Sequence, residues 1–418
     1  MAALDVVVGA ARFAPGFRRT RRHPRRPTAG REQKNVKTRA AAVLLAAASL
    51  VGLLAAPAAH AETDDIWDYR ALGVSGTYIP LMGQFGGDGA TDILWYAPGT
   101  GADSLWIGNS GARGSNAFTR IPVTINKSYT PIVGDFYGDD YDDIIWYAPG
   151  TAPDSAWVSS DVPSGFTTRA ITINGSFKPT VLHDYTGLNR KDDILWYAPG
   201  AAKDYVWHHA ENGSGSYASV NISITGTFQV IAGDWNADNI EDVVLYAPGA
   251  AKDYRWGSKA DGSFAQTSVT VNGNYKPLRI YQENGDSILW WADGYAAEAY
   301  WVRNGSTFRS APVPAVPVRA SIYNLGLQGA AIIVPDDIDG YFYGDTGSGE
   351  FYGLTSGGHD MTTQQAISGD FDDDGWIDVL FYGRGGTKDE LWYSVPGSSD
   401  RAAVPGGHGE KATPVAPR

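Results

Sequence analysis

The stretch DILWYAPGTGADSLW, residues 92–106, decides the fold, because close copies of it recur along the chain. Three further copies begin at Asp143, Asp193 and Asp242, and the last of these reads DVVLYAPGAAKDYRW. In each copy an aromatic or apolar residue precedes a tryptophan by 11 positions, and two later pairs keep the same interval. The six pairs are Trp95/Trp106, Trp146/Trp157, Trp196/Trp207, Leu245/Trp256, Trp290/Trp301 and Phe381/Trp392.

These pairs define repeat units one to five and unit seven, and a degenerate copy near residues 332–334 is unit six. Units one to five follow one another at intervals of 45 to 51 residues. A period of this length means that one supersecondary structure is used repeatedly, and seven copies can be counted.

Each unit contains four short runs rich in Val, Ile, Trp, Tyr and Thr, bounded by Gly, Pro, Asn and Asp. In unit two these runs lie within residues 129–136, 142–150, 154–160 and 169–174. Such runs predict β-strands, and nothing after residue 61 has a helical period. The Pro-Gly of the YAPG phrase suits a hairpin turn whose second central residue has a positive φ. Seven four-stranded antiparallel units predict an all-β fold, a seven-bladed β-propeller over residues 62–405.

The repeated aromatic and acidic residues have a structural explanation in such a fold. We expect the tryptophans to fill the space between neighbouring blades, with exposed platforms for sugar rings as the alternative. An aspartate also stands three residues before the second tryptophan of most units, at Asp103, Asp154, Asp204, Asp253 and Asp389. Such an even recurrence favours a role in shaping turns over contact with a ligand.

Closure of the ring is predicted to involve the segment that precedes unit one. Residues 67–80 align with residues 118–131, which include the outer strand of unit one. We therefore expect residues 67–80 to provide an outer strand of the last blade, beside the strands that end near Trp392. Residues 400–405 are the alternative outer strand, and residues 406–418 form a flexible tail rich in Gly, Pro and Ala.

The first 61 residues differ from the rest. A basic flank precedes AAAVLLAAASLVGLLAAPAAHA, which ends at Ala61 with the small-residue pattern of a signal-peptide cleavage site. We expect a leader and secretory signal in residues 1–61, and a secreted product, with a retained signal anchor as the alternative. Residues 1–35 are long for the basic region of a signal peptide, so Val36 is an alternative start of translation.

The composition excludes some partners. The chain has 418 residues, a net charge of −13 and no cysteine. Residues 1–61 contain 11 of the 33 basic and 2 of the 46 acidic residues, so the remainder has 22 basic and 44 acidic residues, a net charge of −22. A surface this acidic repels nucleic acid and anionic lipid and attracts cations. Without disulfides, a large core or bound metal must stabilise the exported fold. No later segment predicts membrane insertion, and we expect a monomer.

Unit seven contains the clearest candidate metal loop, GDFDDDGWID. Asp370, Asp372, Asp374 and Asp378 occupy positions 1, 3, 5 and 9, and Gly375 at position 6 permits a sharp reversal. Alternate carboxylates on a tight loop converge on one point, and hard oxygen ligands in that number select Ca²⁺. The backbone carbonyl of Trp376, at position 7, is expected to join them. The loop is not an EF-hand, because its position 12 lacks a glutamate.

Other units keep this loop to different extents. Unit four has Asp234, Asn236, Asp238 and Asp242, with the carbonyl of Ile240 at position 7, and we expect a second Ca²⁺ there. Unit two retains Asp135, Asp139 and Asp143 and is a third candidate. Unit one keeps only Asp88 and Asp92 of the carboxylates, unit three has Arg190 and Lys191 in its loop, and units five and six have lost it.

The arrangement resembles the FG-GAP (VCBS-type) repeat, the calcium-binding propeller module of integrin α-subunit heads and of many exported bacterial proteins. The resemblance covers about residues 64–400 and rests on GDFDDDGWIDVLFY (369–382) and GDWNADNIEDVVLYAPG (233–249), with the recurring Ala-Pro-Gly phrases. It implies seven blades, structural Ca²⁺ in the blade loops and an extracellular role in binding protein or carbohydrate. Units three, five and six depart from the metal loop of that family.

These features predict a non-catalytic binding or adhesion module for an extracellular glycan or protein. No nucleophile elbow, zinc motif or phosphate loop is present in the sequence, and no catalytic residue is assigned. A polysaccharide-degrading enzyme, a lyase or hydrolase with a site on the propeller axis, is the alternative, and a structural envelope protein is a second one. Residues that break the repeat are the candidate ligand contacts, namely His183, Arg190 and Lys191.

Overall fold

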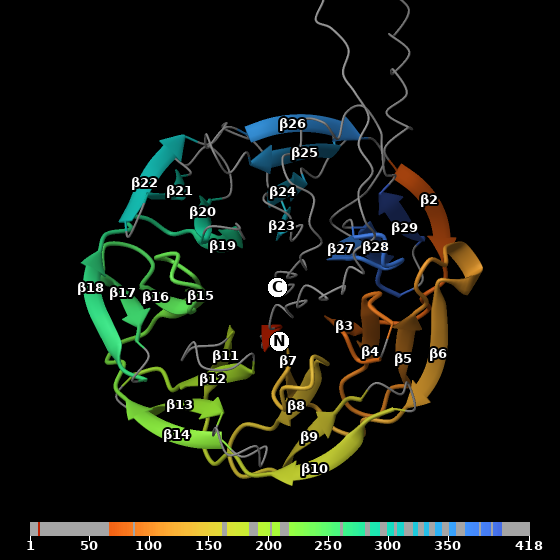
Figure 1. The fold of residues 1–418 in the computed structure, drawn as a ribbon, viewed down its shortest axis with the longest axis horizontal. Helices are drawn as coiled ribbons and strands as arrows, with labels where there is room; N and C mark the ends of the chain where they lie inside the picture. The colour runs from red at the N-terminus through yellow and green to blue at the C-terminus, as the bar shows by residue number, and fades with distance from the viewer. Residues whose placement is uncertain are drawn as a thin grey trace, which may run out of the picture. The chain divides into compact units, whose positions relative to one another are not determined.

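A computed structural model gives the fold of the repeat region (Figure 1). It describes residues 7–8, 67–86, 88–160, 165–183, 191–200, 203–209, 217–259, 262–280, 285–292, 299–304, 307–312, 321–324, 330–333, 339–344, 351–356, 364–375, 378–385 and 388–394. These residues form β-strands and one short 3₁₀ helix, η1 (Gly114–Asn116). No helix among them is long and apolar enough to cross a membrane. Apart from residues 7–8, the predicted leader lies outside the described residues, as do residues 400–405 and the C-terminal tail.

Units one to five each form a sheet of four antiparallel strands in chain order. Unit one contains β3 (Ile79–Gly83), β4 (Asp92–Tyr96), β5 (Asp103–Gly108) and β6 (Phe118–Val123). Unit two contains β7 (Thr130–Gly134), β8 (Asp143–Tyr147), β9 (Asp154–Val158) and β10 (Thr167–Ile171). Unit three contains β11 (Lys178–His183), β12 (Asp192–Tyr197), β13 (Asp204–His209) and β14 (Tyr217–Ile222). A two-residue strand, β1 (Val7–Val8), pairs in parallel with β7.

The later units follow the same plan with one exception. Unit four contains β15 (Gln229–Gly233), β16 (Asp242–Tyr246), β17 (Asp253–Ser258) and β18 (Phe264–Val269). Unit five contains β19 (Lys276–Ile280), β20 (Ser287–Trp291), β21 (Ala299–Asn304) and β22 (Thr307–Pro312). Unit six forms two separate pairs, β23 (Ser321–Asn324) with β24 (Ala330–Ile333) and β25 (Asp339–Gly344) with β26 (Phe351–Ser356). The predicted all-β fold of four-stranded antiparallel units is therefore confirmed in six sheets, unit seven included.

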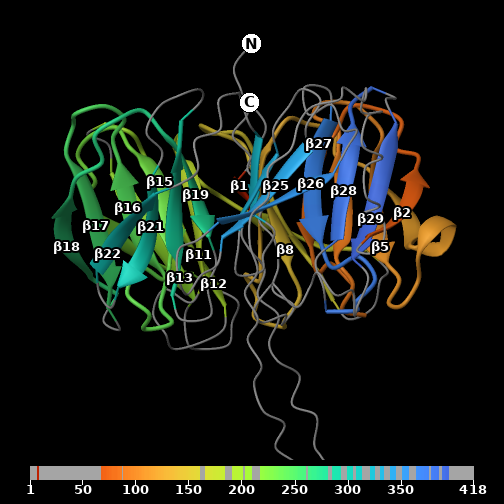
Figure 2. The ribbon, with the colours of Figure 1, turned by 90° about the horizontal axis from the view of Figure 1, so that it is seen from above.

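Unit seven is completed by a strand from the other end of the described chain. Its own strands are β27 (Gln364–Gly369), β28 (Asp378–Gly383) and β29 (Asp389–Ser394), and β2 (Trp67–Leu72) pairs antiparallel with β29. The four strands lie side by side in the order β27, β28, β29, β2 (Figure 2). This confirms the prediction that the segment before unit one is an outer strand of the last sheet.

The tryptophans pack between neighbouring units, as the sequence predicts. In the four pairs that begin with a tryptophan, this first tryptophan is buried and meets the second edge to face, with ring centroids 5.4 Å apart for Trp95 and Trp106. It also contacts a tyrosine of the preceding unit, as in Tyr96–Trp146 at 5.0 Å. The same contact joins Tyr382 of unit seven to Trp95 at 4.9 Å. Aromatic packing is therefore continuous across the point where the two ends of the repeat region meet.

The recurring aspartates shape the hairpins, which confirms the turn role predicted for them. Asp103 accepts the N–H of Ala97 at 2.7 Å with one oxygen and that of Ile125 at 2.8 Å with the other. Asp154, Asp204 and Asp253 accept the corresponding pairs of N–H groups. In unit seven the second donor to Asp389 is Val74, which follows β2 and bonds at 2.7 Å. Val74 thus has the same role in unit seven as Ile125 has in unit one, although it lies 315 residues before Asp389 in the sequence.

Candidate functional site

The acidic loop of unit seven brings together three of its four predicted carboxylates. One carboxylate oxygen each from Asp370, Asp372 and Asp374 lies within 4.8 Å of the other two. Asp370 holds the turn, because its oxygens accept the N–H groups of Asp374 at 3.1 Å and Gly375 at 2.9 Å. Asp378 is buried and accepts the N–H of Phe371. The predicted carbonyl ligand, that of Trp376, lies outside the described residues.

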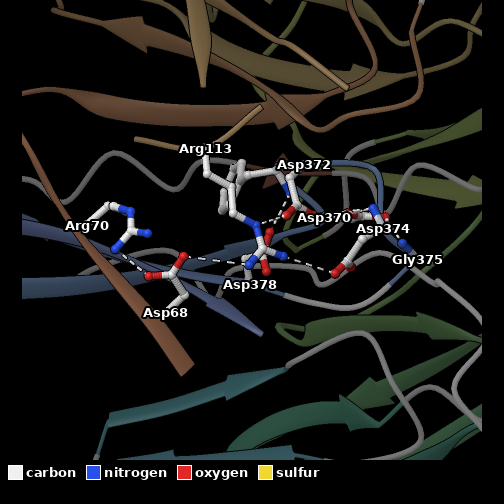
Figure 3. Close-up of polar contacts among 9 residues, drawn as sticks. Asp68, Arg70, Arg113, Asp370, Asp372, Asp374, Gly375 and Asp378 are labelled. Atoms are coloured by element: carbon white, nitrogen blue, oxygen red, sulfur yellow. Dashed lines mark hydrogen bonds and ion pairs between the residues drawn. The ribbon is translucent and has the colours of Figure 1, made fainter. Parts of the chain in front are cut away.

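An arginine from unit one inserts into this loop (Figure 3). Arg113, in the segment between β5 and β6, places Nε 2.5 Å from Asp372 Oδ2 and Nη2 3.2 Å from Asp374 Oδ2. Its third nitrogen lies 3.7 Å from Asp68 of β2, and its guanidinium lies 4.9 Å from the ring centre of Tyr393. Arg113 therefore joins unit one, β2 and unit seven at one point, a role that the repeat pattern did not predict.

The charges in this cluster shift the pKa values of its members. Burial raises the pKa of Asp370 to about 7, with a further contribution from the neighbouring carboxylates. Burial acts to lower the pKa of Arg113, but the hydrogen bond and charge of Asp372 outweigh it and raise that pKa above its usual value. The guanidinium is therefore charged, and it balances part of the negative charge of the loop.

Unit four has the same loop conformation, and Arg255 lies beside it, since its Nη1 donates to the carbonyl of Trp235 at 3.4 Å and its charge acts to lower the pKa of Asp242. Asp234 accepts the N–H groups of Ala237 at 2.6 Å and Asn239 at 3.0 Å, and both donors have a φ of 63°. Asp242 is 0% exposed; Oδ1 accepts the N–H of Ser258, but Oδ2 has no hydrogen-bond partner. Burial, with the charges of Asp238 and Asp234, raises the pKa of Asp242 to about 7. A buried carboxylate oxygen without a partner is costly, so this loop fits a cation.

The two other predicted side-chain ligands of the unit four loop, Asn236 and Asp238, accept backbone N–H groups of the same loop. Asn236 Oδ1 accepts the N–H of Asp238 at 2.9 Å, and Asp238 Oδ1 accepts that of Ile240 at 2.9 Å. The polar side chains of the loop thus serve partly to hold its own backbone in the turn.

The loop of unit two is covered by a lysine from unit three. Asp135 accepts the N–H groups of Gly138 and Asp140, and the buried Asp143 accepts that of Phe136 at 2.9 Å. A Cβ added to Gly138 would lie 1.9 Å from Lys191 Cε, so the lysine stem lies against this loop.

The charge of Lys191 also acts on Asp139. Burial raises the pKa of Asp139, and the positive charge of Lys191 acts in the opposite direction. Lys191, predicted as a ligand contact, therefore lies on the neighbouring acidic loop, and Arg190 lies outside the described residues.

His183 is in the interior between units. It is 3% exposed, and its Nδ1 lies 2.5 Å from Asp192 Oδ1. Its backbone N–H donates to Glu241 Oε2 of the next unit at 2.9 Å. In unit four, the residue at position 1 of the loop makes the corresponding hydrogen bond. The backbone N–H of Asp234 donates to Asp286 Oδ2 of unit five at 2.8 Å. The structure thus assigns His183 to a chain of buried contacts between units, where its ring has no open face for a ligand.

A pocket of about 340 Å³ opens at the end of the molecule that carries the YAPG hairpin of unit one. It lies between residues 73–78, which follow β2, and strands β4 to β6. Its lining includes Val74, Tyr78, Trp95, Ser104, Trp106 and Arg120. The sequence analysis did not predict this pocket.

No known protein family matches the sequence, and no curated protein matches it. The solved structures that are similar to the chain include the following two. A lectin from Agrocybe aegerita that recognises non-reducing terminal N-acetylglucosamine is 15% identical with a TM-score of 0.45, over 82% of this chain and 87% of the lectin. BBS1N, solved in complex with ARL6DN, is 11% identical with a TM-score of 0.46, over 80% of this chain and 98% of BBS1N. Neither similarity assigns the chain to a family.

Proposed function

We propose that the chain is a secreted, calcium-stabilised, seven-bladed β-propeller of the FG-GAP type that binds an extracellular glycan or protein without catalysis. Six four-stranded sheets provide six blades. Unit six would provide the seventh, because its two strand pairs are adjacent in the chain and β24 packs against β25. The pairing of β2 with β29 then closes the ring and leaves few strand edges open.

The oxygen-rich loop of unit four supports the calcium part of the proposal. Asp234, Asn236, Asp238 and Asp242, with the carbonyl of Ile240, would hold the ion. All are hard oxygen donors, the type that Ca²⁺ prefers. The observation that carries this assignment is the buried, unpartnered Oδ2 of Asp242, for which a bound cation would provide the missing partner.

In unit seven, Asp370, Asp372, Asp374 and Asp378, with the carbonyl of Trp376, would hold a second ion. Arg113 pairs with two of these four carboxylates, those of Asp372 and Asp374, so the loop keeps a negative charge after Arg113 is counted. In unit two the candidate ligands are Asp135, Asp139 and Asp143, and Lys191 already supplies a positive charge beside them. Unit two has three candidate side-chain ligands where units four and seven have four, so we expect units four and seven to bind Ca²⁺ more strongly than unit two.

The pocket beside β2 is the observation that supports a binding function. Small-ligand sites are concave, lined with aromatic side chains and supplied with a few polar groups, and this pocket has all three features. The enzyme alternative depended on His183 as a reactive side chain. Since that ring is buried and bonded to Asp192, no observation in the described part of the chain favours catalysis over binding.

A glycan array probed with the labelled full-length protein in calcium tests the binding function. We expect binding to a restricted class of glycans, and no reducing or unsaturated sugar released from the glycans that are bound. Release of such products would contradict the non-catalytic proposal and support the enzyme. If no glycan on the array is bound, the glycan part of the proposal is wrong and a protein ligand remains.

A further inference from the structure

The pocket beside β2 opens at Ser104, a small residue at a position where units three and four have a tyrosine and units two and five have Ser155 and Ala299. Ser104 pairs with Trp95 across β4 and β5, and Tyr205 and Tyr254 hold the same register position in units three and four. Tyr205 meets Phe177 with ring centroids 6.0 Å apart, and Tyr254 meets Phe228 at the same distance. These tyrosines fill the groove between units, whereas Ser104 leaves it open below Tyr78.

The open groove has a positive charge at its rim. Arg120 is exposed and holds its guanidinium 3.9 Å from the ring centre of Trp106. The residues paired with the second tryptophan in units two to four are Thr168, Ser219 and Gln266, so an arginine at this position is particular to unit one. In the described part of the chain Arg120 has no acidic partner and Ser104 Oγ no hydrogen-bond partner. A stacked guanidinium keeps its N–H edge free for a carboxylate, which it binds with two hydrogen bonds.

The remaining walls suit a ring that carries hydroxyl groups. Tyr78 offers a partly exposed aromatic face, and Trp95 forms a buried floor. Asp103 also lines the pocket, but both of its oxygens already accept backbone N–H groups. Aromatic faces pack against the apolar C–H face of a sugar ring, while hydroxyl groups such as those of Ser75 and Ser104 can bond its oxygens.

We propose that this pocket binds a sugar acid, a uronic acid residue of an acidic glycan, with its carboxylate on Arg120 and its ring between Tyr78 and Ser104. This inference rests on the proposed glycan-binding function and names the site and the ligand class. Ser155 of unit two also leaves this position small, but its second tryptophan pairs with Thr168 and not with an arginine, so among the described residues the combination belongs to unit one.

The test uses the full-length protein in calcium with methyl β-D-glucuronide as the probe and methyl β-D-glucoside as the neutral control, titrated by ligand-observed NMR. We expect the glucuronide to bind, the glucoside to bind at least about tenfold more weakly, and the affinity to fall as salt is added. Arg120→Gln removes the charge, and Ser104→Tyr fills the groove as in units three and four. Each should weaken glucuronide binding at least about tenfold. Arg169→Gln is the matched control, because Arg169 stacks on Tyr137 away from the pocket.

The melting temperature of each variant shows whether it folds, and a single properly folded variant is enough for the test. Glucuronide binding that is absent, or unchanged in both Arg120→Gln and Ser104→Tyr, overturns the inference. Binding lost in Ser104→Tyr but kept in Arg120→Gln also overturns it, because the carboxylate would then lie elsewhere. If the protein binds neutral glycans on an array and both variants still bind them, the glycan-binding function stands and only this pocket assignment fails.

Discussion

Replacing Arg279 with methionine is expected to lower the free energy of unfolding by about 3–5 kcal/mol, since it leaves two buried carboxylates without their counterion. Arg279, on β19, bonds Glu241 at 2.5 Å and Asp286 at 2.7 Å. Glu241 is 0% and Asp286 1% exposed, and the arginine side chain is 16% exposed. Burial acts to lower the pKa of Arg279, but the charges of Asp286 and Glu241 outweigh it and raise that pKa.

Thermal unfolding of the full-length variant measures this effect, and we expect the melting temperature to fall by roughly 6–10 °C. Lys252→Met is the matched control, because it removes the same charge from an exposed turn and should change the melting temperature little. Adding Glu241→Gln and Asp286→Asn to the Arg279 variant should restore part of the loss. Equal melting temperatures for the Arg279 and Lys252 variants would show that the network does not stabilise the fold.

Deleting residues 64–74 is expected to have a still broader effect, because it removes β2 and opens the edge of unit seven. The deletion removes all six residue pairs between β2 and β29 and the bond from Val74 to Asp389. It also removes Val74 from a core cluster that contains Trp95 and Phe371. The exposed edge of β29 would then be free to pair with a second molecule.

Size-exclusion chromatography with thermal unfolding distinguishes the outcomes. We expect the deletion variant to aggregate or to melt more than roughly 10 °C below the full-length chain. Deletion of residues 408–418, which removes the same number of residues from the other end, is the control. A deletion variant of residues 64–74 that is monodisperse and melts normally would mean that residues 400–405 supply the outer strand instead.

The repeat made much of the fold predictable from the sequence. The four strands of most units, their antiparallel order and the pairing of residues 67–72 with unit seven all follow from copies that must share one structure. The recurring aspartates were interpreted correctly for the same reason, since Asp103 and Asp389 make the same two bonds in different units. The recurrence of a residue at the same position in successive units indicates a structural role.

Residues outside the repeated phrases could not be placed in this way. Arg113 bonds Asp372, 259 positions away, and nothing in its local sequence indicates that partner. His183 stands out because it breaks the pattern, but a break fits both a ligand contact and an internal ion pair. Only the three-dimensional positions of Asp192 and Glu241 place it in the interior. The pocket beside β2 was not predicted, because it depends on the small size of the side chain at Ser104.

Thermal unfolding of the protein in chelator and in saturating calcium shows whether the loops of units four and seven bind Ca²⁺. Binding to the folded state alone stabilises by about 2.7 kcal/mol per site at a hundredfold excess over Kd. Two sites should therefore raise the melting temperature by roughly 10 °C over that in chelator. Asp238→Ala with Asp374→Ala removes one predicted ligand from each loop, at positions that are at least partly exposed, and should abolish most of this rise. Identical melting curves for the unaltered chain in chelator and in calcium would contradict the account.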